Sequence, residues 1–150
     1  MAIAQVVERL TVHLQNIPPR YQQFPEETLL HRPAPGKWSK KEILGHLCDS
    51  ALNNLKRFED AQCLPQPYSI ISYKQDDLVV INRYQELPLD HVLQLWKTLN
   101  QQIVNVIGNV PADKLTYTVI LTSNESKTLE WLIEDYIDHM DHHWRQVFNA

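Results

Sequence analysis

Three of the seven histidines in this 150-residue chain stand close together near its C-terminal end, in the segment HMDHH at 139–143. His139 and His143 are four residues apart, a separation that places two side chains on one face of a helix, one turn apart. Two imidazoles in that arrangement can converge on one metal ion. His142 is rotated by about 100° from His143 around a helix axis, so we expect His142 to face solvent.

A tight metal site needs a third ligand, which must come from another helix. His46 is the candidate, because it lies in the first half of a second predicted helix and follows Gly45, which allows a neighbouring element to approach closely. A purely structural interpretation also stands, since the pattern HxxxH occurs by chance in many helices. The residue after His139 is Met140, whereas zinc proteases of the HExxH type carry a catalytic glutamate there.

Three neutral imidazoles suit zinc, nickel, iron or copper and do not suit magnesium or calcium; we expect zinc or nickel. Three protein ligands leave coordination positions open, as in catalytic sites. A bound metal lowers the pKa of a coordinating water or thiol, which leads to hydrolysis or to thiol transfer. Asp49 and Asp135, each one turn from a candidate ligand, could accept the second N–H of a ligand histidine, or could be ordinary solvated carboxylates.

The elements that must position these residues are helices. Apolar residues recur at helical spacing in four stretches, at about 2–16, 40–60, 88–108 and 127–148. Ser39 and Glu42 form a capping-box pattern that predicts the start of the second helix, and Pro18-Pro19 predicts the end of the first. The sequence therefore predicts an all-α four-helix bundle.

Long irregular connections join the predicted helices. Residues 62–87 contain two early prolines and a possible short helix at 76–84, residues 26–31 could form a helical turn, and residues 115–122 read as a loop with a strand-like stretch. Tyr73, Asp76 and Asp77 in the longest connection could reach the mouth of the site, although loop surface is the simpler interpretation. We expect Trp144 to line the metal pocket, and His13, His31 and His91 to lie on the surface.

Composition narrows the class of protein. The formal net charge of −4 and the pI of about 5.9 argue against nucleic-acid binding. The sequence contains no run of about 18 apolar residues, so we expect no membrane span. Glu8 and Arg9 interrupt the N-terminal apolar pattern, so we expect no signal peptide and a cytoplasmic protein. Cys48 and Cys63 predict free thiols, with Cys48 pointing away from the metal and packing in the core.

Two segments resemble the DinB/YfiT-like superfamily of metal-dependent enzymes, which are four-helix bundles with a three-histidine metal site. Residues 35–58 are similar to the family's second helix, in which a Trp–Ser turn opens the helix and a histidine follows an aliphatic pair: PGKWSKKEILGHLCDSALNNLKRF. Residues 129–147 resemble the family's last helix, with HxxxH followed by an Arg-Gln-like pair: LEWLIEDYIDHMDHHWRQV.

The resemblance implies a single DinB-like domain over 1–150 with His46, His139 and His143 as metal ligands. It implies a hydrolase or a low-molecular-weight-thiol S-transferase that acts on a small molecule, the second of these with a low-molecular-weight thiol as cofactor, and it assigns no catalytic side chain beyond the metal ligands. It also implies a homodimer. Two alternatives remain open: a non-catalytic metal-binding or stress-related helical protein, and a helical interaction module without a metal.

Overall fold

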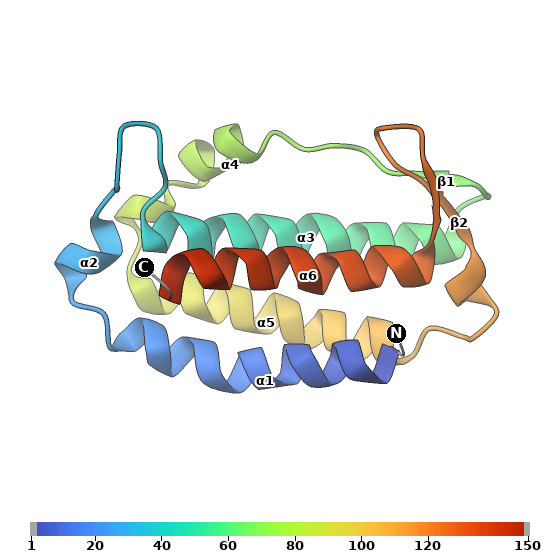
Figure 1. The fold of residues 1–150 in the computed structure, drawn as a ribbon, viewed down its shortest axis with the longest axis horizontal. Coiled ribbons are helices and arrows are strands. Elements are labelled where there is room, and N and C mark those ends of the chain that lie inside the picture. The colour runs from blue at the N-terminus through green and yellow to red at the C-terminus, as the bar shows by residue number, and fades with distance from the viewer. Residues whose placement is uncertain (1–2, 149–150) are drawn as a thin grey trace.

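Four long helices lie side by side in the computed structural model, which describes residues 3–148 (Figure 1). They are α1 (Ile3–Gln22), α3 (Lys40–Cys63), α5 (Leu89–Gly108) and α6 (Leu129–Phe148). α1 packs on α5 and α6, and α3 also packs on α5 and α6, so the helices form a closed ring around one core. The predicted all-α four-helix bundle is confirmed.

The directions of the helices explain the long connections. α3 and α5 run the same way along the bundle, and α1 and α6 run the opposite way (Figure 1). The chain that leaves the end of α3 must therefore travel back along the whole bundle before α5 can begin. Residues 64–88 make this return, and we call them the return connection. It contains β1 (Tyr68–Ser69), α4 (Gln75–Asn82) and the 3₁₀ turn η1 (Tyr84–Glu86), and α4 packs on α3.

The start of α3 is fixed by the predicted capping box. The Ser39 hydroxyl accepts a hydrogen bond from the Glu42 backbone N–H at 3.1 Å, and the Glu42 carboxylate accepts one from the Ser39 N–H at 3.0 Å. Two helical donors that would otherwise lack partners are thereby satisfied. This cap sets the rotation of the helix that carries His46. The buried apolar residues of the helices face the centre of the ring, among them Leu10, Leu44, Leu47, Trp96, Ile103, Ile133 and Ile137.

The prediction that Pro18-Pro19 ends the first helix was wrong. α1 continues through both prolines to Gln22, although a proline inside a helix removes a hydrogen bond and crowds the preceding turn, at a cost of about 3 kcal/mol. Ile17 and Tyr21 are buried in the core, and the Tyr21 hydroxyl donates to the Lys40 carbonyl at 2.8 Å. These tertiary contacts hold the last turn in place. The predicted start at residue 2 lies outside the described residues.

A small three-stranded sheet closes one end of the bundle. β2 (Thr118–Ile120) pairs in parallel with β1 and antiparallel with β3 (Ser126–Thr128), and Tyr68 stands opposite Val119. The strand-like stretch expected at 115–122 contains β2, after the 3₁₀ turn η2 (Lys114–Thr116), but β1 and β3 were not predicted. Strands of two or three residues are too short to show the alternation of apolar and polar residues that predicts a strand. The helical turn expected at 26–31 is α2 (Glu26–Leu30).

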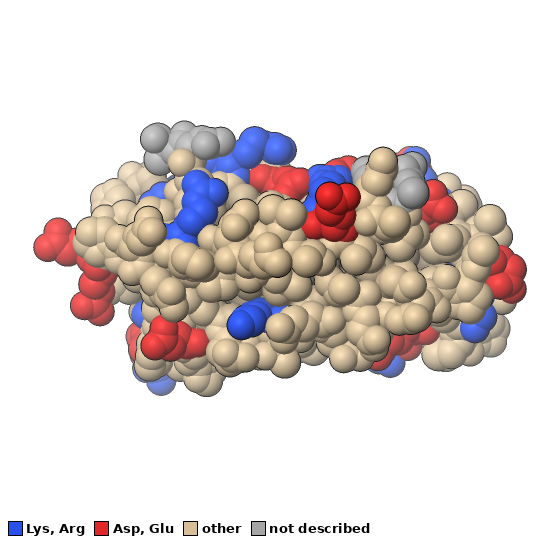
Figure 2. Space-filling view, turned by 90° about the horizontal axis from the view of Figure 1, so that it is seen from below, with Lys and Arg blue, Asp and Glu red and all other residues tan. Residues whose placement is uncertain are grey.

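Charges are scattered over the face shown in Figure 2, where Lys, Arg, Asp and Glu stand singly or in small groups among uncharged residues. Within residues 3–148, no helix is both long and apolar enough to cross a lipid bilayer.

Both cysteines are free thiols, and Cys63 is exposed. Cys48 is buried, and its Sγ lies 3.5 Å from the Val92 carbonyl oxygen, so the predicted packing role of Cys48 is confirmed.

Candidate metal centre

Three histidines from two helices meet inside the bundle. His46 comes from α3, and His139 and His143 come from α6, which packs directly against α3. One ring nitrogen from each lies within 4.8 Å of the other two. The ring centroids are 4.7 Å apart for His139 and His143, 4.8 Å for His46 and His143, and 5.7 Å for His46 and His139. The structure thus brings the three predicted residues together.

His46 is fully buried, and neither of its ring nitrogens has a hydrogen-bond partner among residues 3–148. Burying a polar group without a partner is costly, so this imidazole is built for a partner of another kind. Burial, with the neighbouring His143 and His139, lowers the pKa of His46 to about 3. The ring is therefore neutral near pH 7 and keeps a lone pair. A neutral imidazole donor set fits a divalent transition metal ion.

Gln146 orients His143 through a side-chain hydrogen bond. His143 is buried, and its Nδ1 lies 2.9 Å from Gln146 Oε1. A carbonyl oxygen only accepts, so Nδ1 carries the proton and Nε2 is left with its lone pair. The Gln146 amide nitrogen lies 3.4 Å from Nε2 of the exposed His142. Burial and His139 lower the pKa of His143 to about 4, although the bond to Gln146 opposes that shift.

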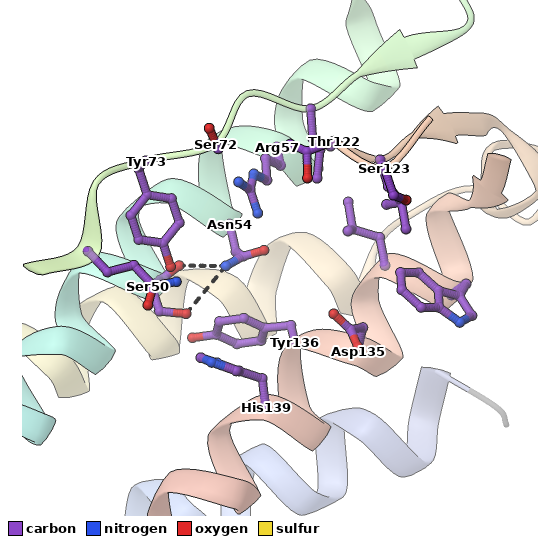
Figure 3. Close-up of a pocket in the computed structure, with 15 residues that line it drawn as sticks. Ser50, Asn54, Arg57, Ser72, Tyr73, Thr122, Ser123, Asp135, Tyr136 and His139 are labelled. Atoms are coloured by element: carbon purple, nitrogen blue, oxygen red, sulfur yellow. Dashed lines mark hydrogen bonds between the residues drawn. The ribbon is translucent and has the colours of Figure 1, made fainter. Parts of the chain in front are cut away.

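His139 is half-buried and lines an open cavity of about 340 Å³. The cavity lies between α3, α6, the return connection and the β2–β3 loop, and Figure 3 shows the side chains that surround it. Burial lowers the pKa of His139, and His142 adds to this effect. Polar residues dominate the lining, among them Ser50, Asn54, Arg57, Tyr73, Thr122, Ser123 and Asp135. One side of the histidine cluster is therefore accessible to a small molecule.

Neither of the two carboxylates considered as supports for the histidines is hydrogen-bonded to a histidine of the cluster within residues 3–148. Asp49 accepts hydrogen bonds from the Tyr84 hydroxyl at 2.6 Å and from the Asn82 amide at 3.1 Å, and burial raises its pKa to about 6. Asp49 therefore fits neither of the two alternatives: His46 has no hydrogen-bond partner within the described chain, and Asp49 is buried rather than solvated. Asp135 lines the cavity beside His139, and no hydrogen bond joins these two side chains in the part of the chain that the structure describes.

The tryptophan that contacts the histidines is Trp38, not Trp144. The Trp38 ring centroid lies 4.7 Å from that of His46, with the two planes tilted by 32°. Trp144 is buried on another side of α6, with its ring edge-on to Trp96 at 5.6 Å. One residue of helix turns a side chain by about 100°, so neighbours in sequence such as His143 and Trp144 face different elements.

Gly45 holds the return connection against α3, next to His46. Tyr84 of η1 is buried directly over this glycine, and a Cβ added to Gly45 would lie 2.1 Å from Tyr84 Cγ. The close approach that the sequence suggested at Gly45 is therefore made by an aromatic ring of the return connection. Sequence patterns gave no indication of Tyr84 as the partner, because the two residues are far apart in the chain.

The other residues singled out in the sequence divide between the site and the surface. Tyr73 lines the cavity that reaches His139, while Asp76 lines a second hollow that includes His143, and Asp77 is exposed. His31 and His91 are exposed as predicted. His13 was wrongly placed on the surface: it is half-buried, and its Nε2 pairs with Asp141 Oδ1 between α1 and α6 at 2.5 Å.

Comparison with known proteins gives one family match and several similar chains. A sequence model of the DinB superfamily matches residues 4–147. A protein of Halalkalibacterium halodurans named "Putative metal-dependent hydrolase BH0277" is 26% identical over 113 residues, which is 75% of this chain and 65% of the relative. The chain thus spans slightly less than two thirds of that relative's length.

Two solved structures share the fold. YfiT from Bacillus subtilis, described as "a probable metal-dependent hydrolase with an unusual four-helix bundle topology", superposes with a TM-score of 0.88 at 16% identity, over 98% of this chain and 84% of YfiT. A mycothiol-dependent maleylpyruvate isomerase superposes with a TM-score of 0.72 at 9% identity, over 98% of this chain and 60% of that one.

Proposed function

Because this chain belongs to the DinB superfamily, we propose that it is a metal-dependent enzyme in which His46, His139 and His143 hold one divalent transition metal ion, zinc or nickel. One observation carries the proposal: three imidazoles present ring nitrogens within 4.8 Å of one another around His46, whose own nitrogens are buried and lack hydrogen bonds within the described chain. A helix bundle has no structural need for such a cluster, since apolar residues would fill the same space at lower cost.

The residues around the cluster have distinct tasks in this proposal. Gln146 holds Nδ1 of His143 and so directs Nε2 toward the centre of the cluster. Trp38 covers His46 and excludes water from its buried side. The cavity at His139 admits the substrate. A divalent ion at such a site acts as a Lewis acid and lowers the pKa of a water or thiol that coordinates it.

Hydrolysis of a small molecule is the reaction we put first. The names of the relative from Halalkalibacterium halodurans and of YfiT both refer to metal-dependent hydrolases, and the cavity lining offers polar groups that can orient a substrate. Transfer of a low-molecular-weight thiol is the second candidate, supported by the shared fold of a mycothiol-dependent isomerase. A non-catalytic metal site is the weaker alternative, because structural sites are closed whereas a cavity reaches His139 here.

Metal analysis of single-histidine variants tests the ligand set. The protein is stripped with a chelator, incubated with zinc or nickel, desalted and assayed by inductively coupled plasma mass spectrometry. Wild type should retain about one ion per chain, and His46→Ala, His139→Ala and His143→Ala should each retain less than about 0.1. His142→Ala is the matched control and should behave as wild type. Failure of wild type to retain metal, or loss of metal in the control, would contradict the proposal.

Activity assays on the zinc-loaded and nickel-loaded protein separate the two reactions. Ester and amide substrates report hydrolysis, and pairs of a low-molecular-weight thiol with an electrophile report transfer. Activity that follows the metal content of the histidine variants supports an enzyme, while a stable metal site without either activity favours the non-catalytic alternative.

We also propose that residues 1–150 form one DinB-like domain and that the protein is a homodimer. Light scattering after size-exclusion chromatography measures the molar mass in solution and so tests the homodimer.

A further inference from the structure

The cavity beside His139 contains one positively charged side chain, Arg57 of α3. Its Nη2 donates a hydrogen bond to the Ile71 carbonyl in the return connection at 2.7 Å, and its guanidinium carbon lies 5.5 Å from the centroid of the Tyr73 ring. These two contacts hold the guanidinium at the edge of the cavity. Figure 3 shows Arg57 pointing into the cavity from the side opposite His139.

No carboxylate forms an ion pair with Arg57 in the described chain, although Asp135 is near enough that Arg57 opposes the rise that burial causes in the pKa of that carboxyl. The hydrogen bond to the Ile71 carbonyl uses one of the five N–H donors of the guanidinium, so the others are left for a ligand. The neighbouring Lys56, in contrast, points to solvent and pairs with Asp60 at 2.8 Å. A half-buried arginine that is held in place but forms no ion pair is suited to bind an anionic group of a ligand. Its guanidinium can donate two parallel hydrogen bonds to the two oxygens of such a group.

The position of Arg57 sets the length of that ligand. Arg57 follows His46 by 11 residues (57 − 46) on the same helix, which is about 16 Å along the axis. Side chains on a helix tilt toward its N-terminal end, so the guanidinium reaches back toward the histidines. A molecule that contacts both must span a distance on the order of 10 Å, and the cavity of about 340 Å³ has room for a small molecule of that length.

We propose that Arg57 is a specificity-determining residue that binds a carboxylate at one end of an extended small substrate, whose other end reaches the histidine cluster. This inference rests on the proposed function and names its substrate class. A carboxylate fits better than a phosphate, because the lining carries one arginine beside one acidic residue, Asp135. One guanidinium balances the single charge of a carboxylate but not the two charges that a phosphate monoester carries on the same group. Asp135 stands on the opposite wall, on α6, and its negative charge directs the anionic end toward Arg57.

Binding of a model dicarboxylate tests the inference independently of catalysis. The probe is pimelate, a straight-chain dicarboxylate, and the control ligand is its neutral diamide. Binding to ¹⁵N-labelled protein is followed by NMR through the Arg57 side-chain N–H and cavity amides, on chelator-treated protein and on zinc-loaded protein. Arg57→Gln should raise the Kd for pimelate about tenfold or more, since a hydrogen-bonded charge pair is lost, and Arg57→Lys should give an intermediate value.

Two variants serve as controls for charge. Lys56→Gln removes the same charge one residue away, from a side chain that is 71% exposed, and should change the Kd less than about twofold because exposed charges are screened. Asp135→Asn should leave pimelate binding unchanged or tighter. The inference is overturned if Arg57→Gln binds pimelate as wild type does, if Lys56→Gln weakens binding as much, if the diamide binds equally well, or if butyl phosphate binds more tightly than pimelate.

The two arms separate this inference from the proposed function. Chelator-treated protein reports the Arg57 contribution with no ion involved, so a chain that failed to retain metal would refute the proposed function while the Arg57 result still stood. A chain that retained zinc through its histidines but bound pimelate independently of Arg57 would refute only the inference.

Discussion

Replacing Gly45 by alanine is a sharp test of how the return connection is held on α3. The new Cβ would lie 2.1 Å from Cγ, 2.2 Å from Cδ2 and 2.7 Å from Cβ of Tyr84. These atoms form the base of the side chain, so a small rotation of the ring cannot relieve the clash. Tyr84 is 3% exposed, and its hydroxyl donates to Asp49 at 2.6 Å. Both its burial and this hydrogen bond are therefore at risk.

The expected loss of stability follows from three contributions. Overpacking a well-packed site costs about 1–3 kcal/mol, and weakening the Tyr84–Asp49 hydrogen bond costs about 1–2 kcal/mol. Alanine in place of glycine in a helix returns about 1 kcal/mol. The clash involves atoms close to the backbone, which favours the upper part of the range, so Gly45→Ala should lower the free energy of unfolding by about 2–4 kcal/mol.

Urea unfolding followed by circular dichroism measures this change, and two further variants sharpen it. Gly108→Ala is the matched control: its new Cβ would meet only Val7 Cγ2, at the ordinary contact distance of 3.9 Å, so it should be neutral or stabilise by up to about 1 kcal/mol. In a Tyr84→Gly background all three clashing atoms, Cβ included, are gone, and Gly45→Ala should also be neutral or stabilising. The reasoning is refuted if Gly45→Ala is as stable as wild type, or if its cost is the same in both backgrounds.

Three other predictions follow from the site and the core. Gln146→Ala should weaken zinc binding about 10–100-fold in a competition with a chelating dye, because His143 loses the partner that fixes its tautomer; Gln146→Glu, which can still accept that bond, should recover most of the affinity. The pKa values of about 3 for His46 and about 4 for His143 lie below the ordinary value of 6.5, so below pH 6.5 the unfolded chain binds protons that the metal-free folded chain does not. The free energy of unfolding should therefore fall as the pH drops from 6.5 to about 4, by up to about 1.4 kcal/mol per pH unit for each histidine. In urea titrations at several pH values, His46→Leu should reduce this dependence of the unfolding free energy on pH. Tyr136→Phe should destabilise the fold by about 1–3 kcal/mol, because the buried Asn100 oxygen loses the hydroxyl that donates to it at 2.6 Å, and thermal unfolding would expose an error if the melting temperature did not change.

The long helices were predictable because their signals are local. Ser39 and Glu42 predict the start of α3 to the residue, and the apolar period of 129–147 predicts which face of α6 turns inward, with His143 buried and His142 exposed. The residues offered His46 only as a candidate to join the two α6 histidines, and the resemblance to the DinB/YfiT-like superfamily implied the full set of three. The structure places the three rings together, while their role as metal ligands stays a prediction.

Features that depend on distant parts of the chain were not predictable in the same way. The prolines in α1 signal a helix end, but burial of Tyr21 overrides that local preference. The link considered between Asp49 and His46 rested on helical spacing alone, whereas Tyr84 and Asn82 of the return connection donate hydrogen bonds to that carboxylate. The spacing of apolar residues along one helix shows which face of that helix is buried, but not which distant segment of the chain packs on that face.

The parallel course of α3 and α5 has an evolutionary consequence. A chain with this topology must contain a segment such as the return connection. Here most residues in its first part, 64–74, are exposed and contribute little to the interior. That segment also supplies Tyr73 and the carbonyl that anchors Arg57. Insertions or substitutions in residues 64–74 would reshape the cavity beside His139 while leaving the four helices undisturbed. Descendants of one ancestral gene can therefore diverge in substrate preference while they keep the same stable fold.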